Sequence, residues 1–116
     1  MRQAGMLAAA GLYALDNNID RLAEDHARAR RLAEAVDAME AFSIDLGAVQ
    51  SNMVYINCEK GAAKILVDKL ADQGVDVLDL EQGVDYGDVS TVRAVVHLHI
   101  TDEDIDRTIA AFAATQ

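Results

Sequence analysis

Cysteine and positive charge are both scarce in this chain. The single cysteine, Cys58, excludes an intrachain disulfide and fits a reducing compartment, so we expect a cytoplasmic location. Ten Lys and Arg face twenty Asp and Glu, which gives a formal net charge of -10. Nucleic acid and anionic membranes would repel such a chain, so we expect neither as a partner.

The sequence also lacks an apolar run of membrane-spanning length. The uncharged run at residues 3–15, QAGMLAAAGLYAL, is shorter than the roughly 17 residues that a bilayer requires. It resembles a short signal peptide, but no small-residue cleavage site follows its apolar part. We interpret it as a helix without a polar face, which must be covered by other protein. Residues 1–17 are therefore expected to pack on a missing large domain or a neighbouring subunit.

Several kinds of chemical site are absent. Gly5 and Gly11 lie inside a helical run, so they do not form a phosphate-binding loop. His97 and His99 have no third ligand at a recognisable spacing, and we expect no metal site. The three lysines all lie in or beside an exposed helical face, where nothing would activate an amine for Schiff-base chemistry: Lys60, Lys64 and Lys69.

What is present predicts an α+β domain over residues 18–116. The pattern indicates a small, mostly antiparallel sheet of about four strands with helices on one face, preceded by the linking apolar helix. Gly74 and Thr101 are expected to cap helices. The expected helices are residues 3–15, 19–39, 61–73 and 102–114, the strands are 42–46, 53–58, 75–80 and 91–100, and residues 81–90 form an acidic loop.

The helix at residues 19–39 has one titratable residue on its apolar stripe. That residue is His26, which no second ligand accompanies at helical spacing. We therefore expect His26 to be a hydrogen-bonded core histidine.

The strand at residues 91–100, TVRAVVHLHI, carries the main candidate site. Alternation places Val92, Ala94, Val96 and Leu98 on a core face and Arg93 on the opposite face with His97. A guanidinium beside apolar neighbours requires an anion. Spacing alone favours an internal carboxylate, because structural ion pairs outnumber ligand sites. The alternative is a bidentate site for a substrate carboxylate or phosphate.

Three stretches together resemble one enzyme family. They are MRQAGMLAAAGLYALDNNIDRLAEDHARARRLAEAV, QSNMVYI and VRAVVHLHIT. These resemble the C-terminal part of low-specificity L-threonine aldolases, in the β-eliminating lyase group of fold-type-I pyridoxal phosphate (PLP) enzymes. The resemblance implies cleavage of L-threonine or L-allo-threonine to glycine and acetaldehyde, in a homodimer or homotetramer. It also implies that this chain is one piece of a longer enzyme.

The resemblance assigns roles to two arginines. Arg93 matches the arginine that binds the substrate carboxylate, and Arg2 matches one that reaches the cofactor region of an adjacent subunit. The catalytic residues and most PLP contacts belong to a large domain before Met1, so we expect no catalytic residue here and no activity from the isolated chain. Val96 and His99 depart from the family motif, which usually has Thr and Asp there.

Two other interpretations remain open at this stage. The chain could be the small domain of another fold-type-I PLP lyase or of an aminotransferase. It could instead be a non-catalytic α+β binding or dimerisation module, in which Arg93 pairs with an internal carboxylate.

Overall fold

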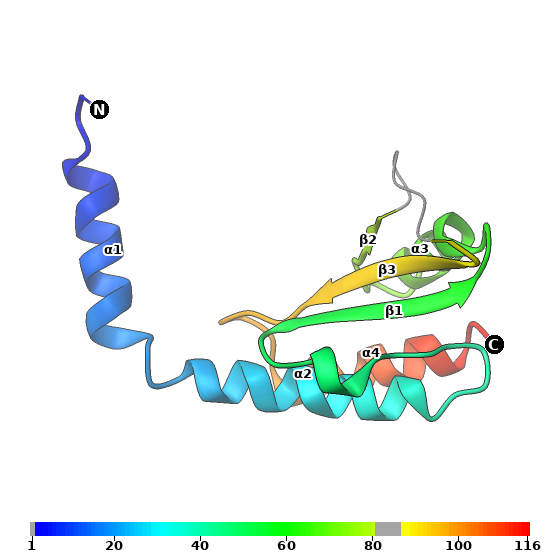
Figure 1. The fold of residues 1–116 in the computed structure, drawn as a ribbon. Helices are drawn as coiled ribbons and strands as arrows, with labels where there is room; N and C mark the ends of the chain where they lie inside the picture. Colours follow the sequence, from blue (N-terminus) through cyan, green and yellow to red (C-terminus); the bar gives the residue numbers. More distant parts are fainter. Residues whose placement is uncertain (1, 81–86) are drawn as a thin grey trace.

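A three-stranded antiparallel sheet organises the chain. The computed structural model describes residues 2–80 and 87–116. Its strands are β1 (Met53–Glu59), β2 (Leu78–Asp79) and β3 (Val89–Val95), in the order β1-β3-β2. The middle strand, β3, pairs antiparallel with both neighbours. Figure 1 shows β1 and β3 as the two long strands and β2 as a short edge.

Alternation along β1 and β3 separates the two faces of the sheet. One face is buried and carries Val54, Ile56, Cys58, Val92 and Ala94. The opposite face, which we call the open face, carries Tyr55, Leu78 and Val95, whose exposed fractions are 46%, 46% and 43%. Side chains alternate across a strand, so the apolar-polar pattern fixes which face is buried.

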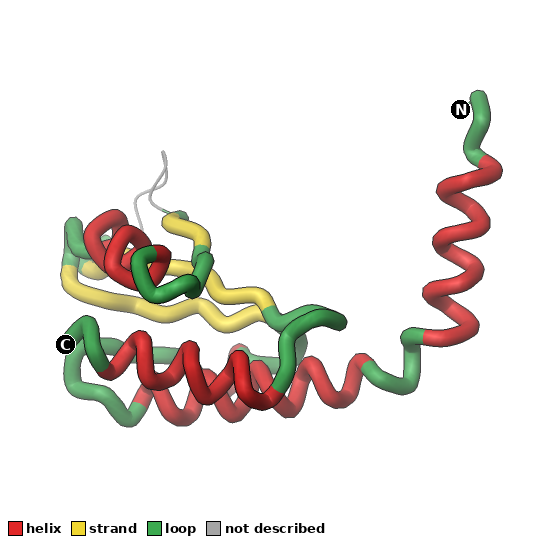
Figure 2. Tube along the Cα trace, turned by 180° about the vertical axis from the view of Figure 1, so that it is seen from behind, coloured by secondary structure: helices red, strands yellow, loops and turns green. Residues whose placement is uncertain are grey.

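Three helices cover the buried face: α2 (Leu22–Asp37), α3 (Ala63–Ala71) and α4 (Asp102–Ala113). Their inward residues form one core with the strands. Helices α2 and α4 run side by side (Figures 1 and 2). Ion pairs join them, with Arg28 Nε 2.8 Å from Asp102 Oδ1 and a second pair between Arg31 and Asp106. The predicted α+β class with helices on one face is confirmed.

The first helix, α1 (Gly5–Asn17), lies apart from this body (Figure 1). None of its residues is buried, and Met6 is 87% exposed. The predicted apolar helix is confirmed as a helix, while its covering partner stays a prediction. No helix in the described ranges is long and apolar enough to cross a membrane.

Predicted caps agree with the structure. Thr101 forms a capping box with Asp104 at the start of α4. Gly74 has φ +76, and its N–H donates to Ala71 O at 2.9 Å. Glycine adopts this left-handed conformation without the steric cost that a Cβ brings.

The prediction of a strand at residues 42–46 is wrong. Only Ser43 pairs, in an isolated bridge with Asn57. The chain then turns into a short 3-10 helix, η1 (Leu46–Ala48), because Asp45 Oδ1 accepts a hydrogen bond from Gly47 N at 3.0 Å. The Asp45 side chain bonds to the main chain at this turn, so pairing with β1 is limited to the bridge at Ser43.

The other strand boundaries also moved. Of the predicted strand 75–80, only Leu78–Asp79 forms a strand, and Leu80 N adds one hydrogen bond to Thr91 O at 3.1 Å. The predicted strand 91–100 runs instead over Val89–Val95. It ends there because the main-chain groups of Val96 bond to Asn52, and the N–H of Ile100 then closes a turn onto His97 O. Residues 81–86 of the expected acidic loop lie outside the described residues, and its last two residues, Val89 and Ser90, belong to β3.

Two predicted core positions are exposed. His26 lies on the surface of α2, and Leu98 is 48% exposed in the turn after β3. Helix α2 begins beyond the end of the long strands (Figure 1), so the first part of its apolar stripe has no sheet beneath it. The buried part of its apolar stripe starts only at Ala29 and continues through Leu32, Ala33 and Val36.

Candidate anion-binding site

Arg93 lies at the centre of the open face. It is on the middle strand β3, paired with Tyr55 of β1 on one side and Leu78 of β2 on the other. Directly paired residues in antiparallel strands point to the same face. The three side chains therefore form one row, with the guanidinium stem between a ring and an aliphatic chain.

The guanidinium of Arg93 lacks an acceptor in the described part of the chain. Its Nε is buried and has no hydrogen-bond partner, and no ion pair there includes Arg93. A buried donor without an acceptor costs about 1–3 kcal/mol, and more when it is charged. The internal carboxylate that spacing alone favoured is thus missing among the described residues. Among residues 2–80 and 87–116, Arg93 is therefore a cation without an anion.

Arg2 is not brought near Arg93. It is exposed, at the far end of α1, and Figure 1 shows the N-terminus well away from β3. Its assigned role toward a cofactor therefore involves atoms outside this chain and stays a prediction.

The two histidines after Arg93 lie in the turn that follows β3. Both are exposed, with ring centroids 5.9 Å apart, and the N–H of His99 donates to His97 Nδ1 at 3.3 Å. Within residues 2–80 and 87–116, no cluster of three or more His, Cys, Asp or Glu side chains could hold a metal ion. Strand alternation predicted that His97 would lie on the face of Arg93. That prediction is wrong, because β3 ends at Val95 and His97 lies in the turn after it.

The lysines and Cys58 lack the environment of reactive groups. Lys64 and Lys69 are exposed on α3, where Lys64 Nζ is 3.1 Å from Asp68 Oδ2. Lys60 Nζ is also exposed and donates to Gly87 O at 2.6 Å. The Cys58 thiol is buried and donates to Ser90 O at 3.4 Å. All three lysines are exposed, and none has the apolar surroundings that would activate an amine for Schiff-base chemistry.

Sequence reasoning missed one buried charge. Asp25 is only 3% exposed, and its two carboxylate oxygens accept from Arg21 at 2.7 and 2.9 Å. These hydrogen bonds are the largest cause of an Asp25 pKa below its ordinary value, and they outweigh the effect of burial. The signal in the sequence was the i,i+4 spacing of the two residues. This pair is helical structure, and it gives no anion site.

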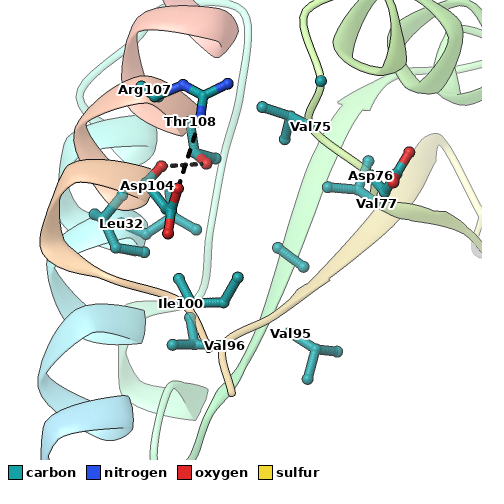
Figure 3. Close-up of a pocket in the computed structure, with 13 residues that line it drawn as sticks. Leu32, Val75, Asp76, Val77, Val95, Val96, Ile100, Asp104, Arg107 and Thr108 are labelled. Carbon is teal, nitrogen blue, oxygen red and sulfur yellow. Dashed lines mark hydrogen bonds and ion pairs between the residues drawn. The ribbon is translucent and has the colours of Figure 1, made fainter. Parts of the chain in front are cut away.

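A cavity of about 140 Å³ lies elsewhere, between α4, the end of β3 and residues 74–77 (Figure 3). Its floor is aliphatic, with Leu32, Val96 and Ile105 among the lining residues. Arg107 and Asp104 lie at its rim, with Nη1 and Oδ1 3.7 Å apart. Arg93 is not among the lining residues, so this cavity is separate from the candidate site.

Comparison with known proteins gives a family. The model of the β-eliminating lyase family matches residues 1–59. The chain is 34% identical over 115 residues to "Low-specificity L-threonine aldolase 1" of Arabidopsis thaliana, covering 97% of this chain and 30% of that protein. It therefore spans about a third of the length of this curated relative.

Solved structures share the fold. Serine palmitoyltransferase of Sphingomonas wittichii superposes with a TM-score of 0.78 at 18% identity, over 92% of this chain and 27% of that one. A structure of SPT with a PLP internal aldimine gives a TM-score of 0.67 at 20% identity, over 79% of this chain and 24% of that one. At these identities the likeness concerns the fold alone. The family match covers half of the sequence, and on that ground this chain belongs to the β-eliminating lyase family.

Proposed function

We propose that this chain is the C-terminal small domain of a PLP-dependent aldolase that cleaves L-threonine or L-allo-threonine to glycine and acetaldehyde. Its contribution is the binding of the substrate carboxylate by Arg93. The observation that carries the proposal is the buried Nε of Arg93, for which the described residues supply no acceptor, on an otherwise half-exposed sheet face. The 34% identity to a threonine aldolase supports the choice of reaction.

A carboxylate suits Arg93 on physical grounds. A guanidinium keeps its charge at every physiological pH, and its planar fork matches the two oxygens of a carboxylate. Tyr55 and Leu78 flank Arg93 on the same face, at the directly paired positions of the neighbouring strands.

The family cofactor is not held by this chain alone. PLP supplies an electron sink for chemistry at the carbon next to the amine. The lysines here are exposed, and the described residues do not form a site that fits it. We place the PLP site mainly in a large domain outside this chain, with Arg2 reaching the cofactor region of a neighbouring subunit. In this arrangement α1 packs on that domain or subunit, within a homodimer or homotetramer.

The test uses the full-length enzyme with Arg93→Lys. We expect the KM for L-threonine to rise about tenfold to a hundredfold, because lysine loses the bidentate geometry. The absorbance of bound PLP should stay the same. Arg107→Lys, at an exposed arginine on α4, is the matched control and should leave KM unchanged.

An unchanged KM for L-threonine in the Arg93→Lys variant would contradict the assignment of Arg93 to the substrate carboxylate. The isolated chain with added PLP should show no cleavage of hydroxyamino acids, and measurable cleavage would overturn its role as a non-catalytic part. A full-length enzyme that binds amino acids but does not cleave threonine would point to another PLP lyase or an aminotransferase.

A further inference from the structure

Asn57 is held unusually firmly on the open face. Its Oδ1 accepts a hydrogen bond at 2.8 Å from the hydroxyl of Thr91, a residue only 5% exposed. Its main chain bonds to Ser43 in both directions, at 2.9 and 3.0 Å, through the isolated bridge on the outer edge of β1. Asn57 is therefore fixed by β3 on one side and by the bridge on the other.

The bond from Thr91 determines what Asn57 offers. The amide oxygen is turned toward Thr91, and the amide nitrogen, which is a donor only, is the other polar end of the side chain. None of the described residues accepts a hydrogen bond from this nitrogen. The side chain thus presents donors, as Arg93 does.

Asn57 and Arg93 are diagonal neighbours on one face. Asn57 pairs with Thr91, and Arg93 pairs with Tyr55, two residues along each strand. Diagonal neighbours are about 7–8 Å apart at the backbone, a separation that long side chains bridge. The acid of β1, Glu59, pairs with Val89 one row further from Arg93. A small anion between Asn57 and Arg93 would meet donors from both.

We propose that the amide nitrogen of Asn57 is a second hydrogen-bond donor to the carboxylate that Arg93 binds, oriented by Thr91. The proposal rests on the function proposed above for Arg93. A carboxylate has about four lone-pair positions, so a bidentate arginine leaves room for a further donor. Fixing the donor beforehand lowers the entropy lost on binding.

The test compares Asn57→Ala with Asn57→Asp in the full-length enzyme. Alanine removes the donor, and we expect the KM for L-threonine to rise about tenfold with little change in kcat. Aspartate keeps an acceptor for Thr91 but replaces the donor with a negative charge. We therefore expect Asn57→Asp to raise KM more than Asn57→Ala while preserving the melting temperature better.

Two further variants complete the design. Thr91→Val releases the amide, and we expect it to raise KM less than Asn57→Ala does. Gln73→Ala removes an exposed amide in the turn after α3 and should leave KM unchanged. Binding of glycine, which has a carboxylate, is compared with binding of aminoethanol, which does not. The Asn57 variants should bind glycine more weakly than the wild type does, and their binding of aminoethanol should be unchanged.

The outcomes separate this proposal from the previous one. If Arg93→Lys raises KM while both Asn57 variants leave it unchanged, the role of Asn57 is overturned and that of Arg93 stands. If none of the variants changes KM, both are overturned. If the KM of Asn57→Asp for L-threonine is no higher than that of Asn57→Ala, the amide contributes only to stability and the proposed role of Asn57 is overturned. Should Asn57→Ala fail to fold, Asn57→Asp still decides the question, because it keeps the bond to Thr91.

Discussion

At the scale of single residues, the most informative charge in the body of the domain is Asp25. It is nearly buried, yet its pKa lies below the ordinary value because Arg21 donates two hydrogen bonds to it, and nearby cations add to this effect. A carboxyl whose pKa is lower in the folded state stabilises the fold above its unfolded pKa. That stabilisation is lost as the pH falls through the folded pKa.

Asp25→Asn should therefore change how the chain responds to acid. Above about pH 4, where an unfolded aspartate is ionised, the variant should melt below the wild type. The difference should shrink as the pH falls toward 2, because the wild type then loses the same ion pair. Thermal unfolding followed by circular dichroism between pH 2 and 6 measures this. Asp20→Asn, at an exposed acid nearby, is the control. A difference that stays constant with pH would contradict the expectation.

Residue-level reasoning was right about the face on which Arg93 lies, while its anion stays a prediction, and it was wrong about the burial of His26. A charge in an apolar strand must be matched wherever the strand lies, so the need for an anion could be predicted from sequence. Burial of His26 depended on whether the sheet extended beneath the start of α2, and it does not. Periodicity identifies an apolar stripe, but the neighbouring element decides how much of it is covered.

At the scale of elements, α4 has the clearest local signal. Thr101 Oγ1 accepts from Asp104 N at 3.2 Å, and the Asp104 carboxylate accepts from Thr101 N at 2.9 Å. The hydrogen bonds that Thr101 donates to the Asp104 carboxylate, first from its main-chain N–H and then from its hydroxyl, keep the Asp104 pKa below its usual value. All partners lie within four residues, which is why the cap was predictable from sequence.

Thr101→Ala should lower the free energy of unfolding by about 1 kcal/mol, because it leaves an N–H group at the helix start without its acceptor. Urea unfolding of the isolated chain is the measurement. Thr115→Ala, at a threonine beyond the end of α4, is the matched control and should change stability less. Equal losses in the two variants would argue against a specific role for the cap.

Helix α3 allows a comparison between its buried and exposed faces. Leu70 is 0% exposed and Ile65 is 59% exposed. Leu70→Ala should cost about 2–5 kcal/mol, because it removes buried methyl groups and leaves a cavity. Ile65→Ala should cost no more than about 0.5 kcal/mol. Denaturant titration of both variants measures this, and a large loss for Ile65→Ala would mean that this face of α3 is covered.

At the scale of the whole molecule, α1 stands out because it lies apart from the body of the domain. Its large apolar side chains are exposed, among them Leu7 at 67% and Leu12 at 62%. An apolar surface of this kind marks an interaction site or an aggregation hazard. The isolated chain should therefore self-associate through α1.

The double variant Leu7→Gln, Leu12→Gln should reduce self-association of the isolated chain while leaving the thermal unfolding of the α2–α4 body unchanged. The reason is that α1 contributes no buried residue to that body. Light scattering and circular dichroism measure the two properties. Leu32→Gln, at a residue 2% exposed, is the contrasting control and should unfold the domain. A fall in the melting temperature of the double variant would show that α1 packs on the body.

The sequence by itself determined the features that depend on short-range pattern. Helical and strand periods, the Thr101 cap, the Gly74 turn, the lone apolar helix and the placement of Arg93 opposite the core face all arise within a few residues of chain. The tertiary structure decided where β3 stops pairing, because that depends on a distant partner, Asn52, which bonds to Val96. It also decided that Asn57 and Thr91, 34 residues apart, meet beside Arg93. Such contacts follow from the register of β1 on β3, which packing across the whole sheet sets.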